Sequence, residues 1–377
     1  MEQIEVNVPK GWSWKKFEDV CVLKRGYDLP THARSVGNIP LYSANGVTDY
    51  IDQFKVEGPG VVTGRSGTIG KVHFVESDFW PLNTALYVQK FNGNYPRFIK
   101  YFLEIFDLTR FSSGAAVPTL NRNSFSSELV CTPDSIDEQK RIVEKLDALL
   151  TRIDVAIEHL QESASLADAL YASELNNIFS SGDNKWPLRK INEVAEVARG
   201  KSKHRPRNDK SLFGGDYPFI QTGDVRNAQK YITTFSTSYN EKGFQQSKLW
   251  PKDTICLTIA ANIGDVAILG MDACFPDSIV GISSSELETD YLYYFLTTLQ
   301  QQLDSKANAA AQKNINLKIL SEIEIPVPTL NEQRDIVSKI NAVDQISVRV
   351  KAEISEKITM MQQLKVSILD SAFKGEL

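Results

Sequence analysis

A glycine-rich run at residues 64–71, Gly-Arg-Ser-Gly-Thr-Ile-Gly-Lys, has the composition of a loop that binds phosphate. A nucleotide-binding P-loop needs four residues between its glycines and Ser or Thr directly after the lysine. Here five residues separate Gly64 from Gly70, and Val72 follows the lysine. This spacing argues against nucleotide binding. A Gly-rich hairpin that brings Arg65 close to a DNA strand is the better functional interpretation, and a purely structural turn is the alternative.

The sequence carries no signature of an active site. Neither the adenine-methyltransferase motif Asn/Asp-Pro-Pro-aromatic nor the dinucleotide motif Gly-x-Gly-x-x-Gly occurs. None of the histidines has a ligand or nucleophile partner at a suitable spacing: His32, His73, His159 and His204. The cysteines are scattered rather than paired as in zinc sites: Cys21, Cys131, Cys256 and Cys274. We therefore predict a protein that is not an enzyme, with no metal and no cofactor of its own.

Basic side chains gather in one short stretch of the second half of the chain. They are Arg199, Lys201, Lys203, His204, Arg205 and Arg207. With Gly200 and Pro206 among them, they form a loop suited to phosphate contacts, whose strength depends on salt. A solvated surface loop without a partner is the alternative interpretation.

Polar side chains near the ends of expected strands are candidates for reading bases. Asn or Gln forms paired hydrogen bonds with adenine, and Arg does so with guanine. Asn and Gly in turns also serve the backbone alone. The side chains predicted to contact DNA are Arg34, Ser43, Asn45, Arg65, Ser66, Asn83, Arg122, Lys201, Lys203, His204, Arg205, Arg207, Gln221, Thr222, Asn262, Lys313 and Asn314.

The sequence contains an internal repeat that covers most of the chain. Residues 12–20 resemble residues 186–194, and Glu138–Gln139 corresponds to Glu332–Gln333. The offset between the copies grows from 174 (12 to 186) to 194 (138 to 332), so the second copy carries about twenty extra residues. We place them mostly between residues 231 and 253, in surface loops on a shared scaffold.

Each copy ends in a long helical tract with an apolar seam. The tracts are expected to begin at the N-caps Asp137 and Asn331. The seam residues recur at an average spacing of 3.5, which is typical of a coiled coil. They are Ile142, Leu146, Leu149, Ile153, Ala156, Leu160, Ala167 and Leu170, then Ile336, Ile340, Val343, Val350, Ile354, Met361 and Ile368. Pairing with a second molecule is the alternative to pairing within the chain.

These patterns predict an α+β protein with two similar mixed α/β globules separated by two helices that form an antiparallel coiled coil. The expected domains are residues 1–136, a helix at 137–180, residues 181–329, and a helix at 330–377. Aromatic residues on periodic faces, among them Trp12, Phe17, Tyr101, Phe102, Tyr293 and Phe295, are expected in the cores.

The net charge of −5 does not by itself favour a DNA-binding protein. The acidic excess, however, falls within residues 137–180, which hold four basic and nine acidic side chains. Both globules are neutral overall, so a DNA-facing surface must arise from local clustering. No signal peptide or long apolar run is apparent, so we expect a cytoplasmic location.

The order of these motifs resembles the specificity subunit of type I restriction–modification enzymes. The resemblance covers the whole chain and includes Pro9–Lys10–Gly11–Trp12, Pro-x-x-x-Glu-Gln-x-x-Ile at 328–336, and the ending 368–377. The first Pro-to-Glu-Gln spacing, at 133–139, is one residue longer than the second.

The resemblance implies that each globule is a target-recognition domain for one half of a bipartite, asymmetric DNA site. It implies that the paired helices dock two adenine-methylating subunits, which bind S-adenosylmethionine, and that separate motor–nuclease subunits use ATP and Mg²⁺. An alternative function is a coiled-coil scaffold that joins two protein-binding globules and never contacts DNA.

Overall fold

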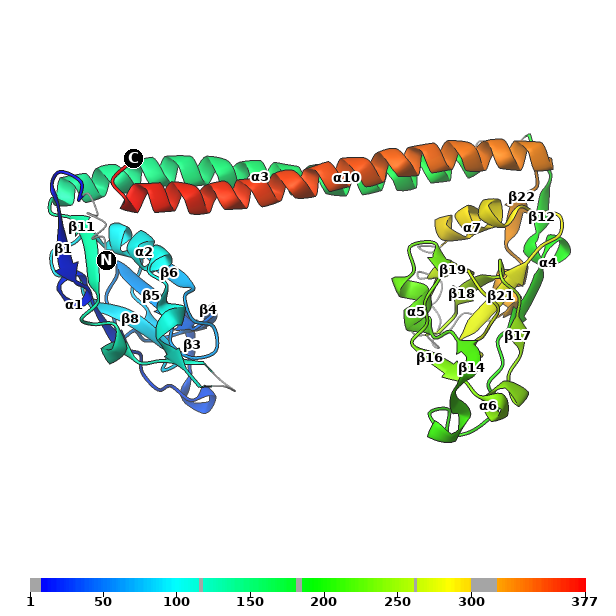
Figure 1. Ribbon diagram of the computed structural model, residues 1–377, viewed down its shortest axis with the longest axis horizontal. Coiled ribbons are helices and arrows are strands. Elements are labelled where there is room, and N and C mark those ends of the chain that lie inside the picture. Colours follow the sequence, from blue (N-terminus) through cyan, green and yellow to red (C-terminus); the bar gives the residue numbers. More distant parts are fainter. Residues whose placement is uncertain (1–7, 115–117, 181–184, 261–262, 300–316) are drawn as a thin grey trace, which may run out of the picture. The chain divides into compact units, whose positions relative to one another are not determined.

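The computed structural model describes residues 8–114, 118–180, 185–260, 263–299 and 317–377 (Figure 1). The chain divides into two compact units. Unit 1 comprises residues 1–161 and 355–377, and unit 2 comprises residues 162–354. Each unit contains one globule and a stretch of both long helices, α3 (Ile136–Ser180) and α10 (Leu330–Phe373).

The globule of unit 1 is built on two small sheets. Its strands are β1 (Trp12–Lys16), β2 (Val22–Arg25), β3 (Val36–Ser43), β4 (Gly46–Ile51), β5 (Gly60–Gly64), β6 (Val72–Val75), β7 (Trp80–Pro81), β8 (Ala85–Lys90), β9 (Ser112–Ser113), β10 (Thr119–Leu120) and β11 (Leu129–Pro133). Its helices are α1 (Phe17–Val20) and α2 (Pro96–Ile105), with 3-10 turns at Thr31–Ala33, Leu108–Phe111 and Arg122–Ser124. One sheet has the strand order β2-β8-β5-β6 and the other β4-β3-β7, while β1 pairs with β11 and β9 with β10.

The globule of unit 2 repeats this plan with additions. Its strands are β12 (Leu188–Lys190), β13 (Glu196–Arg199), β14 (Phe213–Phe219), β15 (Tyr231–Ile232), β16 (Thr237–Tyr239), β17 (Leu249–Trp250), β18 (Ile255–Thr258), β19 (Val266–Leu269), β20 (Ala273–Cys274), β21 (Ile279–Ser283) and β22 (Glu324–Pro326). Its helices are α4 (Ile191–Val194), α5 (Thr222–Asn227), α6 (Glu241–Gln245), α7 (Thr289–Thr298) and α9 (Leu317–Ser321), with a 3-10 turn at Lys210–Leu212.

The strand orders of the two globules match. In unit 2 the sheets run β13-β21-β18-β19-β15 and β16-β14-β20-β17, which adds one edge strand to each sheet of unit 1. The parallel pair β3–β7, with Leu41 opposite Trp80, has its counterpart in β14–β20, with Phe219 opposite Cys274. The predicted internal repeat is confirmed at the level of topology.

The extra residues of the second copy begin earlier than the sequence suggests. Seventeen residues separate β14 from β16, whereas two separate β3 from β4. A smaller difference lies between β16 and β18, where fifteen residues stand against eight between β4 and β5. The predicted range 231–253 therefore contains β15 and the second difference, but it misses the start of the insertion at residue 220. Most of it directly follows Phe219 and includes α5 and β15, whose polar residues align with nothing in the first copy.

Aromatic residues fill the cores as predicted. In unit 1, Phe17 on α1 contacts the rings of Phe102 and Phe106 from α2 and its C-cap, at centroid distances of 5.5 and 4.8 Å. In unit 2, Phe179 of α3 packs on Tyr291 and Phe295 of α7. The long helices thus contribute directly to the hydrophobic core of each globule.

A glycine at the end of β2 and of β13 permits a close backbone crossing in both globules. A Cβ atom on Gly26 would lie 2.2 Å from the carbonyl oxygen of Leu82, and one on Gly200 would lie 2.4 Å from that of Phe275. The repeated Arg-Gly dipeptide of the sequence therefore reflects a steric requirement, because any side chain would collide with backbone atoms.

Within each unit the two long helices run antiparallel. In unit 1, Lys365 on α10 pairs with Asp154 on α3 at 2.6 Å, and Arg141 donates to the terminal carbonyl of Leu377. In unit 2, Lys351 pairs with Asp168 at 2.7 Å. This confirms the predicted antiparallel pairing within the chain.

Two predicted seam residues and both predicted N-caps are wrong. Leu170 is 62% exposed and Val350 is 38% exposed, and buried Ser347 occupies the seam near Val350. The helix α3 begins at Ile136, where the hydroxyl of Ser135 accepts from the amide of Asp137. The helix α10 begins at Leu330, where the Thr329 hydroxyl accepts from the amide of Glu332 and the Glu332 carboxylate from that of Thr329. A hydroxyl two residues earlier, that of Ser135 or Thr329, caps each helix instead.

Candidate nucleic-acid interface

The turn between β3 and β4 presents the first predicted base-reading residues. The hydroxyl of Ser43 accepts from the amide of Asn45 at 3.3 Å and donates to the carbonyl of Gly46 at 3.2 Å. Asn45 is exposed at the tip, and its carbonyl accepts from the ammonium of Lys71 at 3.2 Å. Ser43 therefore shapes the turn, while the Asn45 side chain faces solvent beside a cation.

The glycine-rich loop lies against this turn. The amide of Arg65 donates to Thr84 at 2.9 Å, and its guanidinium donates to the carbonyl of Asn83 at 3.4 Å. Ser66 forms a bridge with Thr119, and the Asn83 side chain donates to Asp28. Arg65, Ser66 and Asn83 thus lie together, and the Lys71 contact joins their loop to the hairpin turn.

Two other predicted residues of unit 1 have structural partners. The guanidinium of Arg34 donates to the carbonyl of Leu29 and pairs with Asp49 on β4 at 3.5 Å. The guanidinium of Arg122 donates to the carbonyl of Leu23 on β2 at 3.5 Å. Within the described residues, no hydrogen bond or ion pair joins Arg122 to the β3–β4 turn.

The basic loop of unit 2 lies between β13 and the 3-10 turn before β14. Lys201, Lys203 and Arg205 are exposed, which leaves their charges accessible to a phosphate backbone. His204 is held more firmly, because its Nε2 lies 2.9 Å from the carboxylate of Asp209. Hydrogen bonds from the backbone and side chain of Ser211, and from His204, lower the pKa of Asp209 to about 2.

The basic loop and the end of β14 meet at one cavity. This cavity of about 390 Å³ is lined by Arg207 and Asn208 from the loop, and by Gln221 and Thr222 at the start of α5. The rings of Phe213 and Phe219 form part of its wall. Two groups of residues predicted separately from the sequence are therefore brought together. The predicted Asn262, Lys313 and Asn314 lie outside the described residues.

A buried glutamine fastens the first globule to α3. The side chain of Gln139 is 2% exposed. Its oxygen accepts from the amide of Tyr95, the N-cap of α2, at 2.8 Å, and its nitrogen donates to Asn94 at 2.7 Å and to Pro133 at 3.4 Å. One amide side chain thus joins three segments: the start of α2, the end of β11 and the first turn of α3.

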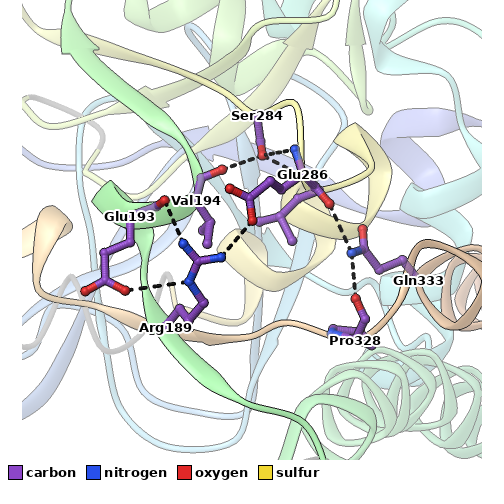
Figure 2. A network of polar contacts seen from close by, with 8 residues as sticks. Arg189, Glu193, Val194, Ser284, Glu286, Pro328 and Gln333 are labelled. Atoms are coloured by element: carbon purple, nitrogen blue, oxygen red, sulfur yellow. Dashed lines mark hydrogen bonds and ion pairs between the residues drawn. The ribbon is translucent and has the colours of Figure 1, made fainter.

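The second copy has the same fastening, and Figure 2 shows the bonds of Gln333 to Glu286 and Pro328. Gln333, 1% exposed, accepts from the amide of Glu288 at 2.7 Å and donates to the carbonyls of Pro328 at 3.0 Å and Glu286 at 3.4 Å. Arg189 of β12 binds the carboxylate of Glu286 at 2.7 Å and the carbonyl of Glu193. The Glu-Gln pair that recurs in the sequence could have indicated this contact. A glutamine repeated at the start of both helices is a candidate for a buried side chain, and a buried side-chain amide needs several hydrogen-bond partners.

A second matched contact orients the helices. The hydroxyl of Tyr101 on α2 donates to Asp147 on α3, and that of Tyr294 on α7 donates to Asn341 on α10, both at 2.5 Å. Burial, with the bond to Asp147, raises the pKa of Tyr101. The sequence predicts Tyr101 only as a core residue and does not single out Tyr294. Their polar bonds could not be predicted from the repeat, because the acceptors Asp147 and Asn341 differ in type.

Other kinds of site find no support in the described ranges. They contain no group of three or more His, Cys, Asp or Glu side chains arranged to hold a metal ion. They also contain no helix with the length and apolar content needed to cross a membrane.

Known proteins share both the sequence pattern and the fold. A family model described as the type I restriction modification DNA specificity domain matches residues 9–166 and again residues 183–360. The type I restriction enzyme MjaIX specificity subunit of Methanocaldococcus jannaschii is 30% identical over 183 residues, 46% of this chain and 42% of that protein. A putative type I restriction enzyme specificity subunit of Haemophilus influenzae is 24% identical over 349 residues, 89% of this chain and 88% of its own length.

A solved structure supports the fold. The structure titled as the basis of complex assembly and conformational transition of the type I R-M system has a TM-score of 0.77 at 18% identity, covering 98% of this chain and 100% of that one. The family match includes both globules and the start of each long helix. The chain therefore belongs to the type I restriction modification DNA specificity family, as a non-catalytic subunit that supplies DNA sequence specificity.

Proposed function

We propose that each globule reads one half of a bipartite, asymmetric DNA site. The observation that carries this proposal is the duplicated plan. The shared strands have the same order in both globules, but two residues connect β3 to β4 where seventeen connect β14 to β16. Two globules that share a scaffold but differ in their loops are suited to recognise two short base sequences that differ from each other. Base contacts specify the sequence, while the basic side chains around them contact phosphates.

We further propose that the long helices dock two copies of an adenine-methylating subunit and, through them, motor–nuclease subunits. S-adenosylmethionine, ATP and Mg²⁺ would bind those partners. Large apolar side chains that the chain itself leaves exposed on the helices support a partner surface, among them Leu166, Leu170, Ile346 and Val366. Each helix is roughly 65 Å long at about 1.5 Å per residue, which suits a spacer between two half-sites.

The experiment that tests this function is co-expression with the neighbouring methyltransferase gene, followed by long-read sequencing of adenine methylation. We expect two short base sequences separated by a fixed gap, with methylation lost when this chain is deleted. A stable complex that leaves the pattern of methylation unchanged would contradict the proposal. No complex with a methyltransferase and no salt-sensitive DNA binding would favour the scaffold alternative.

A further inference from the structure

Arg207 is held by a carboxylate from a different segment of unit 2. Its Nη2 lies 2.6 and 2.8 Å from the two carboxylate oxygens of Asp277, which lies between β20 and β21. The carboxylate engages one guanidinium nitrogen. Among the described residues no hydrogen bond engages Nη1 or Nε of Arg207. A guanidinium has five N–H donors in a rigid plane, so Nη1 and Nε keep donors for a second acceptor.

The orientation of Arg207 serves recognition better than stability. Both side chains are substantially exposed, at 48% and 38%, and exposed ion pairs contribute little to folding. The ion pair does reduce the number of rotamers that the Arg207 side chain can adopt before binding. Preorganisation of this kind lowers the entropy cost of a specific contact.

The surroundings of Arg207 differ from those of a phosphate-binding cation. It lines the cavity of about 390 Å³ together with the polar side chains Asn208, Gln221 and Thr222. The side chain of Gln221 is itself held in place, since its Nε2 donates to the hydroxyl of Thr237 at 3.1 Å. A net-neutral Arg–Asp pair attracts phosphate weakly, while Nη1 and Nε, which Asp277 does not engage, keep N–H donors for the acceptors O6 and N7 of guanine.

The candidate arginines of unit 1 are engaged differently. Arg65 and Arg122 donate to backbone carbonyls of Asn83 and Leu23, which fixes loops of the globule itself. Arg34 pairs with the carboxylate of Asp49 at 3.5 Å, but its guanidinium also donates to the carbonyl of Leu29. In unit 2, Arg205 likewise donates to the carbonyls of Ser202 and His204. Arg207 combines a carboxylate support with a position on the wall of the cavity.

We infer that Arg207, supported by Asp277, reads a guanine in the second half-site, while the neighbouring lysines contact phosphates. The inference rests on the proposed function and deepens it by naming a base and the residue that recognises it. It also separates the roles of the basic loop, which sequence analysis treated as a single phosphate-binding stretch.

The test measures binding of the full chain with its methyltransferase partner to duplexes carrying the wild-type split site. Each base pair of both half-sites is replaced in turn. For Arg207→Ala we expect discrimination at one G·C pair of the second half-site to fall by on the order of 10- to 100-fold. For Asp277→Asn we expect a smaller loss at the same pair, because the arginine remains but is less well oriented.

Lys203→Ala is the matched control. This exposed lysine of the same loop should weaken binding to all sequences by a similar factor and reduce the salt dependence of the affinity. The first half-site supplies an internal control for folding, since each variant should read it as the wild type does.

Three results would overturn the inference. One is a wild-type second half-site without any G·C pair. Another is an Arg207→Ala variant that loses affinity evenly over all sequences, which would make Arg207 a phosphate contact. The third is a variant whose base preferences equal those of the wild type. All three presuppose a wild-type chain that reads a split site, so they are distinct from failure of the proposed function, in which the wild type recognises no site.

Discussion

The two globules have the same scaffold and different surfaces. Both place a glycine at the backbone crossing after the strands β2 and β13, and both anchor their long helix through a buried glutamine. They differ after β3 and β14, where the first has a tight turn at Asn45 and the second has α5, β15 and the Arg207 cavity. The glutamine that joins each globule to its long helix is present in both copies. The segments that we propose to face DNA differ between the copies.

Removal of the segment that distinguishes the second globule from the first should have the largest effect on function. Replacing residues 220–236 by the two-residue turn Ala-Asn should abolish the base preference of the second half-site and leave the first unchanged. The segment that carries Gln221 is then lost together with the edge strand β15 and the buried side chains of Ile220, Val225 and Ile232, while both sheets retain their central strands. Methylated motifs read by long-read sequencing measure this. Equal loss of both halves would instead indicate general unfolding, which circular dichroism would reveal.

Loss of either glutamine should destabilise its globule by a similar amount. Gln139→Ala removes the partner of the part-buried amide of Tyr95, and Gln333→Ala that of the amide of Glu288, which costs about 1–3 kcal/mol in the free energy of unfolding. Urea unfolding measures the loss. Gln345→Ala, at an exposed position of α10, is the matched control with little expected change. A near-zero effect in one copy would contradict the equivalence of the two junctions.

The backbone crossings offer a second stability comparison. Gly26→Ala and Gly200→Ala each force backbone atoms apart, at a cost of about 1–3 kcal/mol. Gly223→Ala is the control, because no atom lies within 4 Å of a Cβ there. Thermal melting compares the three variants. If Gly26→Ala melts like the wild type, the crossing is not a shared steric requirement.

A smaller effect concerns pH and is expected in unit 2. Backbone and side-chain bonds from Thr329, with Trp186 and Lys185, lower the pKa of Glu332 to about 2. Its stabilising contribution is present above the ordinary pKa near 4.5 and is lost as pH falls from there toward 2. Glu332→Gln should therefore flatten the decline of melting temperature over this range. An unchanged slope would show that the carboxylate contributes nothing there.

The sequence predicts the scaffold better than the site. The repeat, the core aromatics and the helical tracts follow from periodicity, which burial imposes on every residue of an element. The position of the insertion does not follow, because α5 is short and polar. Nor does the Arg207–Asp277 pair, since 70 residues separate its members and only the fold brings them together. The exposed Leu170 shows the same limit: apolar spacing marks a helix face but does not say what covers it.

The assignment of one half-site to each globule is tested by the methylated motif of a chain in which a copy of the first globule replaces the second. We expect a split motif in which both halves carry the bases of the wild-type first half, because each globule reads its half-site independently. A motif identical to that of the wild type, or one in which the first half also changes, would contradict the assignment of one half-site to each globule.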